Sequence, residues 1–311
     1  MSEMIKIFNN VGVSKFVFIP NPGNAGDSLI NAATFQFFDD NKLEYTVLSP
    51  RQIKKDIQKN IDVIKKYNLN GVTLILGGGG AFSSNYTYSR DLINAVHKSV
   101  SKLILLPCTV EGHQDLLNQL NENCYIFCRE QVSFNYLADL NKKINVFLHD
   151  DMAFFVNLNV LLSLKSYPSS FEKKLKNIKS NLIVKKHIKK HGTKHLFALR
   201  LDPESNTNSI PSGNLDMSQL FSLGCAFKND NLNTAKELAI NLNKFDEITT
   251  DRLHIGILST LLGKKVNFLS NSYFKNKAVF ENSLTKFDNI KFSQNTDLKL
   301  PYDAINQSLA R

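Results

Sequence analysis

The sequence lacks several features that would assign a function class at once. It has no apolar run near the roughly 18 residues that a membrane-spanning helix needs, and its first residues do not form a secretory signal. Its glycine loops contain neither the Gly-Lys-Ser/Thr of a Walker A loop nor a Gly-x-Gly-x-x-Gly dinucleotide fingerprint. We therefore expect a soluble, cytoplasmic protein whose glycine loops serve some other ligand.

Cysteine is also scarce. The four cysteines show no Cys-x-x-Cys pair and no accompanying histidine spacing. Neither a zinc site nor a disulfide framework is indicated, and we expect no metal or other cofactor. The cysteines are Cys108, Cys124, Cys128 and Cys225.

Positive charge is abundant, because the formal net charge is +10 at pH 7. This balance favours anionic partners: nucleic acid, an acidic membrane surface or anionic metabolites. Much of the charge lies between Lys165 and Lys194, where Leu175, Ile178, Leu182 and Ile183 recur at helical spacing. One interpretation is a solvated helical face, and the other is docking on an anionic membrane leaflet. Nucleic acid is disfavoured because no aromatic residues interleave with the lysines from Lys173 onward and no binding motif is present.

Short apolar runs alternate with helical patterns along the first half of the chain. Such alternation predicts an α/β fold with a parallel sheet, whose ligands lie at the carboxyl ends of the strands. Residues 51–67 are expected to form one helix. The expected strands are 15–20, 45–49, 72–77, 102–110, 124–128 and 146–150 in the first half, and 195–200, 247–249 and 265–269 in the second. The length suits two domains, for which we expect boundaries of 1–165 and 166–311.

Two glycine loops follow strands of the first half. Asn24, Gly26 and Asp27 stand where the first strand gives way to a helix, and Asp27 is a natural helix cap. The third strand ends in four glycines, which include Gly78, Gly79 and Gly80. Such a run predicts a loop where a ligand or another backbone comes close.

Three arginines follow strand ends, namely Arg129, Arg200 and Arg252. All three are expected to face one cleft, because the carboxyl ends of parallel strands lie at one edge. Guanidinium groups pair with carboxylates and phosphates, so a ligand with more than one anionic group is indicated. His254 follows Arg252 at the start of a helix and is the best-placed titratable group.

Taken in order, these motifs resemble the polysaccharide pyruvyl transferase family. They are Asn24-x-Gly26-Asp27, the run Gly77 to Gly80, Arg129-Glu130 with Ser133, Asp151-x-Ala153, Thr250 to His254, and Asn271 to Asn276. The resemblance implies two Rossmann-like domains facing a cleft, similar to the glycosyltransferase B architecture. It also implies transfer of the enolpyruvyl unit of phosphoenolpyruvate onto two hydroxyls of a sugar.

The resemblance and the residue chemistry together suggest roles. His254 is expected to be the general acid and base, with Arg129, Arg252 and Arg200 as donor ligands and Tyr273 and Lys275 completing the donor pocket. The acceptor is expected to be a saccharide of a bacterial surface polysaccharide or its lipid-linked precursor. The residues expected near it are Asn24, Gly26, Asp27, Gly78, Gly79, Gly80, Ser83, Asn85 and Tyr86.

Two alternatives remain open. A nucleotide-sugar-dependent glycosyltransferase of the same architecture would need an acidic ribose contact, which Asp202 or Glu204 could supply. The other alternative is a non-catalytic saccharide-binding protein of a capsule pathway.

Overall fold

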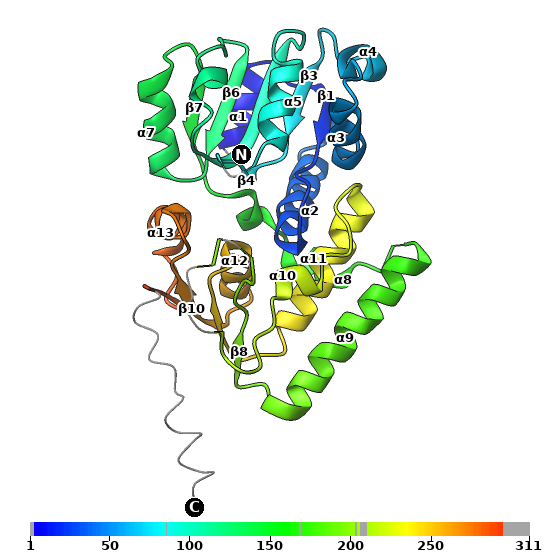
Figure 1. Ribbon diagram of the computed structural model, residues 1–311, viewed down its shortest axis with the longest axis vertical. Coiled ribbons are helices and arrows are strands. Elements are labelled where there is room, and N and C mark those ends of the chain that lie inside the picture. The colour runs from blue at the N-terminus through cyan, green and yellow to red at the C-terminus, as the bar shows by residue number, and fades with distance from the viewer. Residues whose placement is uncertain (1–2, 85, 168, 203, 206–209, 295–311) are drawn as a thin grey trace, which may run out of the picture.

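The computed structural model describes residues 3–84, 86–167, 169–202, 204–205 and 210–294, and within them the chain forms two parallel sheets with surrounding helices (Figure 1). In the first sheet the strand order is β2-β1-β3-β5-β6-β7, and β4 pairs with β5 beside this path. Its strands are β1 (Lys15–Ile19), β2 (Glu44–Val47), β3 (Thr73–Leu76), β4 (Gly79–Phe82), β5 (Lys102–Val110), β6 (Cys124–Cys128) and β7 (Asn145–Leu148).

The second sheet has the order β11-β10-β9-β8, and all its pairings are parallel as well. Its strands are β8 (His195–Phe197), β9 (Glu247–Thr250), β10 (Lys265–Leu269) and β11 (Ile290–Ser293). The α/β class with parallel sheets is therefore confirmed.

Helices cover both faces of the first sheet because its strands are apolar on both sides. Leu74 and Leu76 of β3 lie in the core beneath α3 to α7, whereas Ile75 lies in the core beneath α1 and α2. The helices are α1 (Glu3–Asn10), α2 (Ala25–Asp40), α3 (Pro50–Gln58), α4 (Val63–Tyr67), α5 (Tyr88–Val96), α6 (Gln114–Leu117) and α7 (Gln131–Leu140).

Two expectations about this half were wrong. The single helix expected over residues 51–67 is two helices, because Asn60 takes a left-handed conformation with φ 54° and Asp62 caps a new helix at Lys65 N. The glycine run is not only a loop, since Gly79 and Gly80 begin strand β4. The pairing of this run with β5 could not be predicted from the sequence, because glycine is unfavourable in strands.

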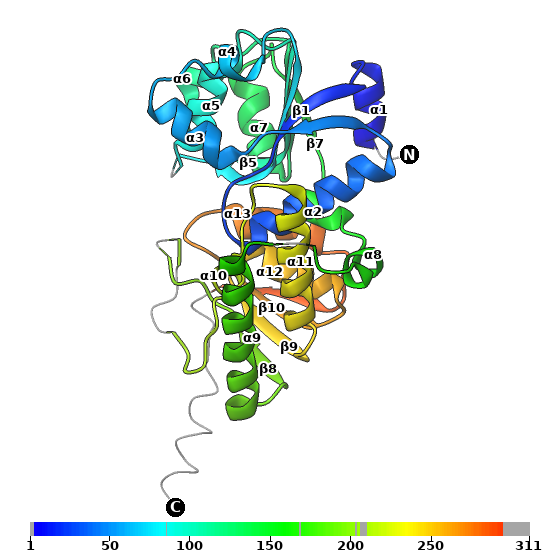
Figure 2. The ribbon, with the colours of Figure 1, turned by 90° about the vertical axis from the view of Figure 1, so that its right-hand side faces the viewer.

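The second sheet is surrounded by helices from the rest of the chain (Figure 2). Between β10 and β11, helix α13 continues into a π-helical turn, η2. These elements are the 3₁₀ turn η1 (Met152–Phe155), α8 (Leu158–Ser163), α9 (Phe171–His191), α10 (Met217–Leu220), α11 (Lys228–Leu242), α12 (Leu253–Leu261), α13 (Lys275–Val279) and η2 (Phe280–Leu284). Among the described residues, no helix combines the length and apolarity needed to cross a membrane.

Helix α2 joins the two halves. Its aromatic residues Phe35 and Phe38 pack in the core of the first sheet, whereas Leu29 and Ala33 belong to the core of the second. A helix buried on both sides needs apolar residues around its whole circumference, and 13 of its 16 residues are buried. The start of α2 is therefore fixed between the two sheets, where the pocket described next lies.

Candidate active site

A pocket of about 350 Å³ lies where the carboxyl ends of both sheets meet. The segments after β1, β3 and β6 supply Asn24, Gly80 and Arg129 from the first sheet. The segments after β8, β9 and β10 supply Arg200, His254 and Lys275 from the second. In the first sheet the chain passes from β2 back across β1 to β3, so the pocket adjoins the switch point where α/β proteins bind ligands.

His254, Arg129 and Asp151 form a compact polar cluster in the pocket. Nε2 of His254 lies 3.4 Å from Oδ2 of Asp151 and 3.4 Å from Nη1 of Arg129. A neutral imidazole can accept from Arg129, and a protonated one can donate to Asp151. The same ring position therefore suits both protonation states, which a group that moves protons requires.

Asp151 and Arg129 are fully buried and hold one another. Nη1 of Arg129 donates to Oδ2 of Asp151 at 2.8 Å, and its Nε donates to Oγ1 of Thr109 at 2.9 Å. Burial raises the pKa of Asp151, but the charges of His254 and Arg129 outweigh burial and hold it well below its usual range. Asp151 also accepts from Ala153 N, so it caps η1 as well as carrying the charge that faces His254.

The start of α2 forms the neighbouring wall. Asn24 and Asp27 make a capping box, in which Asn24 Oδ1 accepts from Gly26 N and Asp27 Oδ2 accepts from Asn24 N. Asp27 Oδ1 accepts from Nδ2 of Asn21 at 2.6 Å. Burial raises the pKa of Asp27, and the lowering effect of His254 only partly opposes the rise. A Cβ atom at Gly26 would lie 2.9 Å from Nδ1 of His254, so the imidazole rests directly against this helix start.

The glycine run serves two different purposes. A Cβ atom would lie 2.4 Å from Asn21 N at Gly77 and 2.2 Å from the carbonyl oxygen of Pro107 at Gly78, so these glycines permit close backbone packing. At Gly80 a Cβ atom would point toward two cations, 3.5 Å from Nη2 of Arg129 and 3.8 Å from Nζ of Lys275. Gly80 therefore leaves space between two positive groups.

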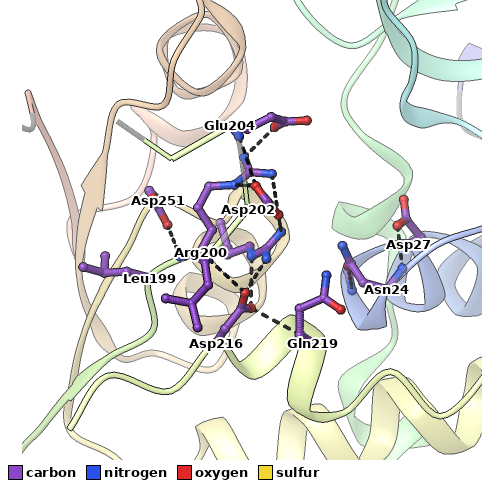
Figure 3. A network of polar contacts seen from close by, with 12 residues as sticks. Asn24, Asp27, Leu199, Arg200, Asp202, Glu204, Asp216, Gln219 and Asp251 are labelled. Atoms are coloured by element: carbon purple, nitrogen blue, oxygen red, sulfur yellow. Dashed lines mark hydrogen bonds and ion pairs between the residues drawn. The ribbon is translucent and has the colours of Figure 1, made fainter. Parts of the chain in front are cut away.

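Arg200 and Arg252 form an ion-pair network with carboxylates (Figure 3). Arg200 donates from Nε to Oδ1 of Asp202 at 2.7 Å, and Asp202 also lies 2.8 Å from Nη1 of Arg252. Asp216, which caps α10, accepts hydrogen bonds from Nε and Nη2 of Arg252. Acids of the protein itself therefore neutralise these cations.

Lys275 belongs to the same network. Its Nζ donates to Oε2 of Glu204 at 2.8 Å and lies 4.8 Å from the ring centre of Tyr273. Burial lowers the pKa of Lys275 to about 8, because the positive charges of Arg129 and Arg200 add to burial and Glu204 only partly compensates. Burial alone would raise the pKa of Glu204, yet Lys275 and Arg200 bring it down to about 2. Lys275 is therefore a cation at neutral pH, and it loses its proton at a pH slightly above neutral.

Asp251 lies behind the arginines. Its Oδ1 accepts from the backbone N of Arg200 at 2.8 Å, and its Oδ2 is buried without a hydrogen-bond partner among the described residues. Burial raises the pKa of Asp251 to about 6, despite the opposing effect of the Arg200 backbone and of the two arginines.

The structure brings most of the expected residues together. Of the expected residues, those that line the pocket are Asn24, Asp27, Gly80, Tyr86, Arg129, Arg200, Arg252, His254 and Lys275. The backbone of Gly26 lies against the imidazole of His254, and the ring of Tyr273 lies against Nζ of Lys275. Gly78, Gly79 and Ser83 are not part of the lining, and Asn85 lies outside the described residues.

Three further residues that line the pocket were not predicted from the sequence. Ser218, Gln219 and Ser222 line it from α10 and the turn that follows. Figure 3 shows Gln219 between Asp216 and Asn24 in this view. The Asp216 cap before a short helix was the available clue, because Asp is a preferred N-cap residue. Within the described part of the chain, no group of His, Cys, Asp and Glu side chains is arranged to hold a metal ion.

Comparison with known proteins yields a family and similar solved structures. The family model for polysaccharide pyruvyl transferase matches residues 24–273. The crystal structure of a functionally uncharacterized protein from Klebsiella pneumoniae subsp. pneumoniae is similar, with a TM-score of 0.69 and 31% sequence identity. That similarity covers 94% of this chain and 99% of the Klebsiella chain. No curated protein matches.

Proposed function

The chain belongs to the polysaccharide pyruvyl transferase family, and we propose that it transfers the pyruvyl unit of phosphoenolpyruvate to a saccharide as a cyclic ketal. The proposed architecture is two Rossmann-like domains that face one another across the pocket, as in glycosyltransferase B enzymes. The proposed acceptor belongs to a bacterial surface polysaccharide or to its lipid-linked precursor.

The charges around the pocket support this donor. Phosphoenolpyruvate carries a carboxylate and a phosphate, so two anionic groups need cationic partners. Arg129 and Lys275 flank the space above Gly80 and suit one of these groups. Arg252 and Arg200 line another part of the pocket and suit the other group once Asp202 and Glu204 give way.

The chemistry requires proton transfer as well as anion binding. A sugar hydroxyl gives up its proton and its oxygen bonds to C2 of the enol, while a proton is delivered to C3, which becomes the methyl group. The bond between C2 and the phosphate oxygen then breaks, the second hydroxyl oxygen bonds to C2, and its proton leaves with phosphate. We assign these proton movements to His254, whose Nε2 lies beside both a carboxylate and a guanidinium.

The acceptor fits the opposite wall of the pocket. Asn24 and Asp27 there offer short polar side chains, and Tyr86 offers an aromatic face. Gln219 and Ser218 add further polar groups from α10. Asp27 has a raised pKa and lies within the electrostatic reach of His254, so it suits a hydroxyl that must lose a proton.

The cluster of His254, Asp151 and Arg129 in a cation-lined pocket is the observation that carries the proposal. The test is incubation with phosphoenolpyruvate and a panel of saccharides, with phosphate release and ketal formation as readouts. His254→Ala and Arg252→Ala should each lower the rate by at least about 100-fold. His191→Ala and Arg90→Ala, two surface changes, are the matched controls. Full activity in both pocket variants would refute the proposal.

Both alternatives can be separated in the same assay. A glycosyltransferase would release nucleoside diphosphate from a nucleotide sugar and ignore phosphoenolpyruvate. The two carboxylates expected for a ribose contact, Asp202 and Glu204, pair instead with arginines and Lys275. That pairing gives the glycosyltransferase less support. A non-catalytic protein would bind saccharide with no turnover of either donor.

A further inference from the structure

Helix α9 carries an apolar stripe on its exposed side. Five of the twelve large apolar side chains that are exposed in the described chain lie on this one helix. Phe171, Leu175, Ile178 and Leu182 recur at helical spacing and are 81%, 41%, 57% and 50% exposed. Steps of four, three and four residues place them on one face.

The opposite face of α9 packs against the protein and is mixed, because Val184 is buried in the core of the second sheet and Ile188 packs against that core. Its inward positions include Lys173, which pairs with Asp230, and Ser180, whose Oγ donates to the Leu220 carbonyl oxygen at 2.6 Å. The apolar stripe therefore lies outside the core contact that Val184 makes, although a surface helix usually turns its apolar side chains inward. Figure 1 shows α9 at the margin of the molecule, and Figure 2, viewed from that side, shows it in front. No described element covers its outer side.

Lysines flank the stripe. Seven exposed lysines lie on α9 against one acid, Glu172. The charge decides between the possible occupants of this face. A second copy of the chain would bring lysines against lysines, whereas a bilayer with anionic headgroups offers both an apolar layer and complementary charge. The exposed lysines available to lipid phosphates are Lys174, Lys179, Lys185, Lys186, Lys189 and Lys190, whereas Lys176 donates to the Ser222 carbonyl oxygen on the inner side.

We propose that the outer face of α9 docks on an anionic lipid membrane, with Phe171, Ile178 and Leu182 in the headgroup boundary and the lysines on the lipid phosphates. The helix lies on the surface and does not span it. This docking is independent of the donor chemistry.

The position of α9 relates the membrane to the pocket. Ser180 and Lys176 on its inner side bond to the carbonyl oxygens of Leu220 and Ser222, and Ser222 lines the pocket. A helix is about 10 Å across, so the pocket wall begins one helix diameter from the docked surface. Provided that the proposed function holds, a lipid-linked saccharide is the acceptor class that this placement suits.

The test is cosedimentation of the full-length protein with vesicles. Phosphatidylcholine vesicles with about 30 mol% phosphatidylglycerol should bind the protein, and vesicles of phosphatidylcholine alone should bind it much less. Raising the salt from about 0.1 M to about 1 M should weaken binding, because the screening length falls from about 10 Å to about 3 Å. Binding of wild-type protein that is equal on both vesicles, or absent from both, would overturn the proposal.

Two sets of variants locate the binding face. The apolar set is Phe171→Gln, Ile178→Gln and Leu182→Gln, and the charge set is Lys185→Gln, Lys186→Gln, Lys189→Gln and Lys190→Gln. Each set should lower vesicle partition by at least about tenfold. Wild-type binding by both sets would overturn the assignment to α9.

Matched controls change equal numbers of exposed side chains elsewhere. They are Ile61→Gln with Val132→Gln and Val160→Gln for the apolar set, and Lys54→Gln with Lys55→Gln, Lys59→Gln and Lys65→Gln for the charge set. Binding by the controls should stay within about twofold of wild type.

Two further readouts distinguish membrane docking from self-association and from pyruvyl transfer. A wild-type dimer in solution that the apolar set makes monomeric would assign the stripe to a second copy and refute membrane docking. Pyruvyl transfer to a water-soluble saccharide should be unchanged in both α9 sets. Absence of transfer in every protein would count against the proposed function, while the vesicle results would still decide the docking.

Discussion

The imidazole of His254 rests on the backbone of Gly26, where an added Cβ atom would lie 2.9 Å from Nδ1. Gly26→Ala should therefore displace the ring from Asp151 and Arg129. We expect the rate of pyruvyl transfer to fall about 10- to 100-fold, because small displacements of a catalytic group have effects of that size. Stability should change little, since alanine favours the helix by about 1 kcal/mol and offsets part of the clash.

Gly71→Ala is the control for Gly26→Ala. Gly71 has φ +70° and open space around its Cα, so alanine there strains the backbone far from the pocket. That variant should lose stability and keep its rate, which is the opposite pattern. Unchanged activity in Gly26→Ala would show that the position of the ring is not critical.

Asp151→Asn should impair both folding and activity. The two carboxylate oxygens accept from Nη1 of Arg129 and from Ala153 N, so an amide must turn its NH2 toward one of these donors. The change also leaves the buried guanidinium without its charge partner. We expect a loss of roughly 3–5 kcal/mol in the free energy of unfolding. The rate at a temperature where the variant is folded should fall at least about 100-fold. Urea unfolding and single-turnover assays measure the two effects.

Asp62→Asn is the comparison for that variant. Asp62 caps α4 through Oδ1 and lies near no residue of the pocket, so its replacement should alter stability by at most about 1 kcal/mol and the rate not at all. Equal effects of the two substitutions would mean that Asp151 acts only as a cap.

Much of the candidate site could be predicted from strand ends alone. Arg129 and Arg200 each follow an apolar run and His254 follows strand β9, and parallel strands place such residues at one edge. Their partners could not be predicted. Asp202 and Asp216 meet Arg252 only through the path of a loop after β8, and loop paths depend on tertiary contacts that local sequence does not encode.

The fold shows the same division. Runs such as Cys124–Cys128 are long enough and apolar enough to be recognised as buried strands. Strand β4 was missed because its glycines oppose strand formation, and it forms only because Pro107 and its neighbours in β5 accept a close backbone. Which side of helix α9 is exposed could not be predicted from local sequence, because an apolar stripe on a helix normally marks the buried side.

Stability should depend on the ionisation of Asp251. Its pKa in the folded protein is raised to about 6, so its contribution to folding is fully present below the unfolded value near 3.8 and is lost as the pH rises through 6. Between pH 7 and pH 5 the wild-type protein should gain ~1 kcal/mol relative to Asp251→Asn, which cannot ionise. Urea unfolding of both proteins at the two pH values measures this difference. Parallel pH dependence would contradict it.

Donor binding should weaken in mildly alkaline solution. Lys275 has a pKa lowered to about 8 and loses its charge as the pH rises through that value. The KM for phosphoenolpyruvate should therefore rise up to about tenfold between pH 7 and pH 9. Lys275→Arg keeps its charge throughout this range and should remove the dependence. A KM that rises equally in both proteins would assign the effect to another group.

Glu204 is expected to compete with the proposed donor for the same cations. The carboxylate accepts from Nζ of Lys275 at 2.8 Å and pairs with Nη1 of Arg200, and its pKa of about 2 keeps it ionised at neutral pH. Glu204→Gln should lower the free energy of unfolding by roughly 1–3 kcal/mol, because two buried cations lose a partner. The same change should strengthen donor binding, so phosphoenolpyruvate should raise the Tm of the variant more than that of the wild type. Asp56 pairs with Lys66 and Tyr67 in a similar network remote from the pocket. Asp56→Asn should therefore lose stability with no change in the donor-induced shift, and equal shifts in all three proteins would show that Glu204 does not occupy the donor position.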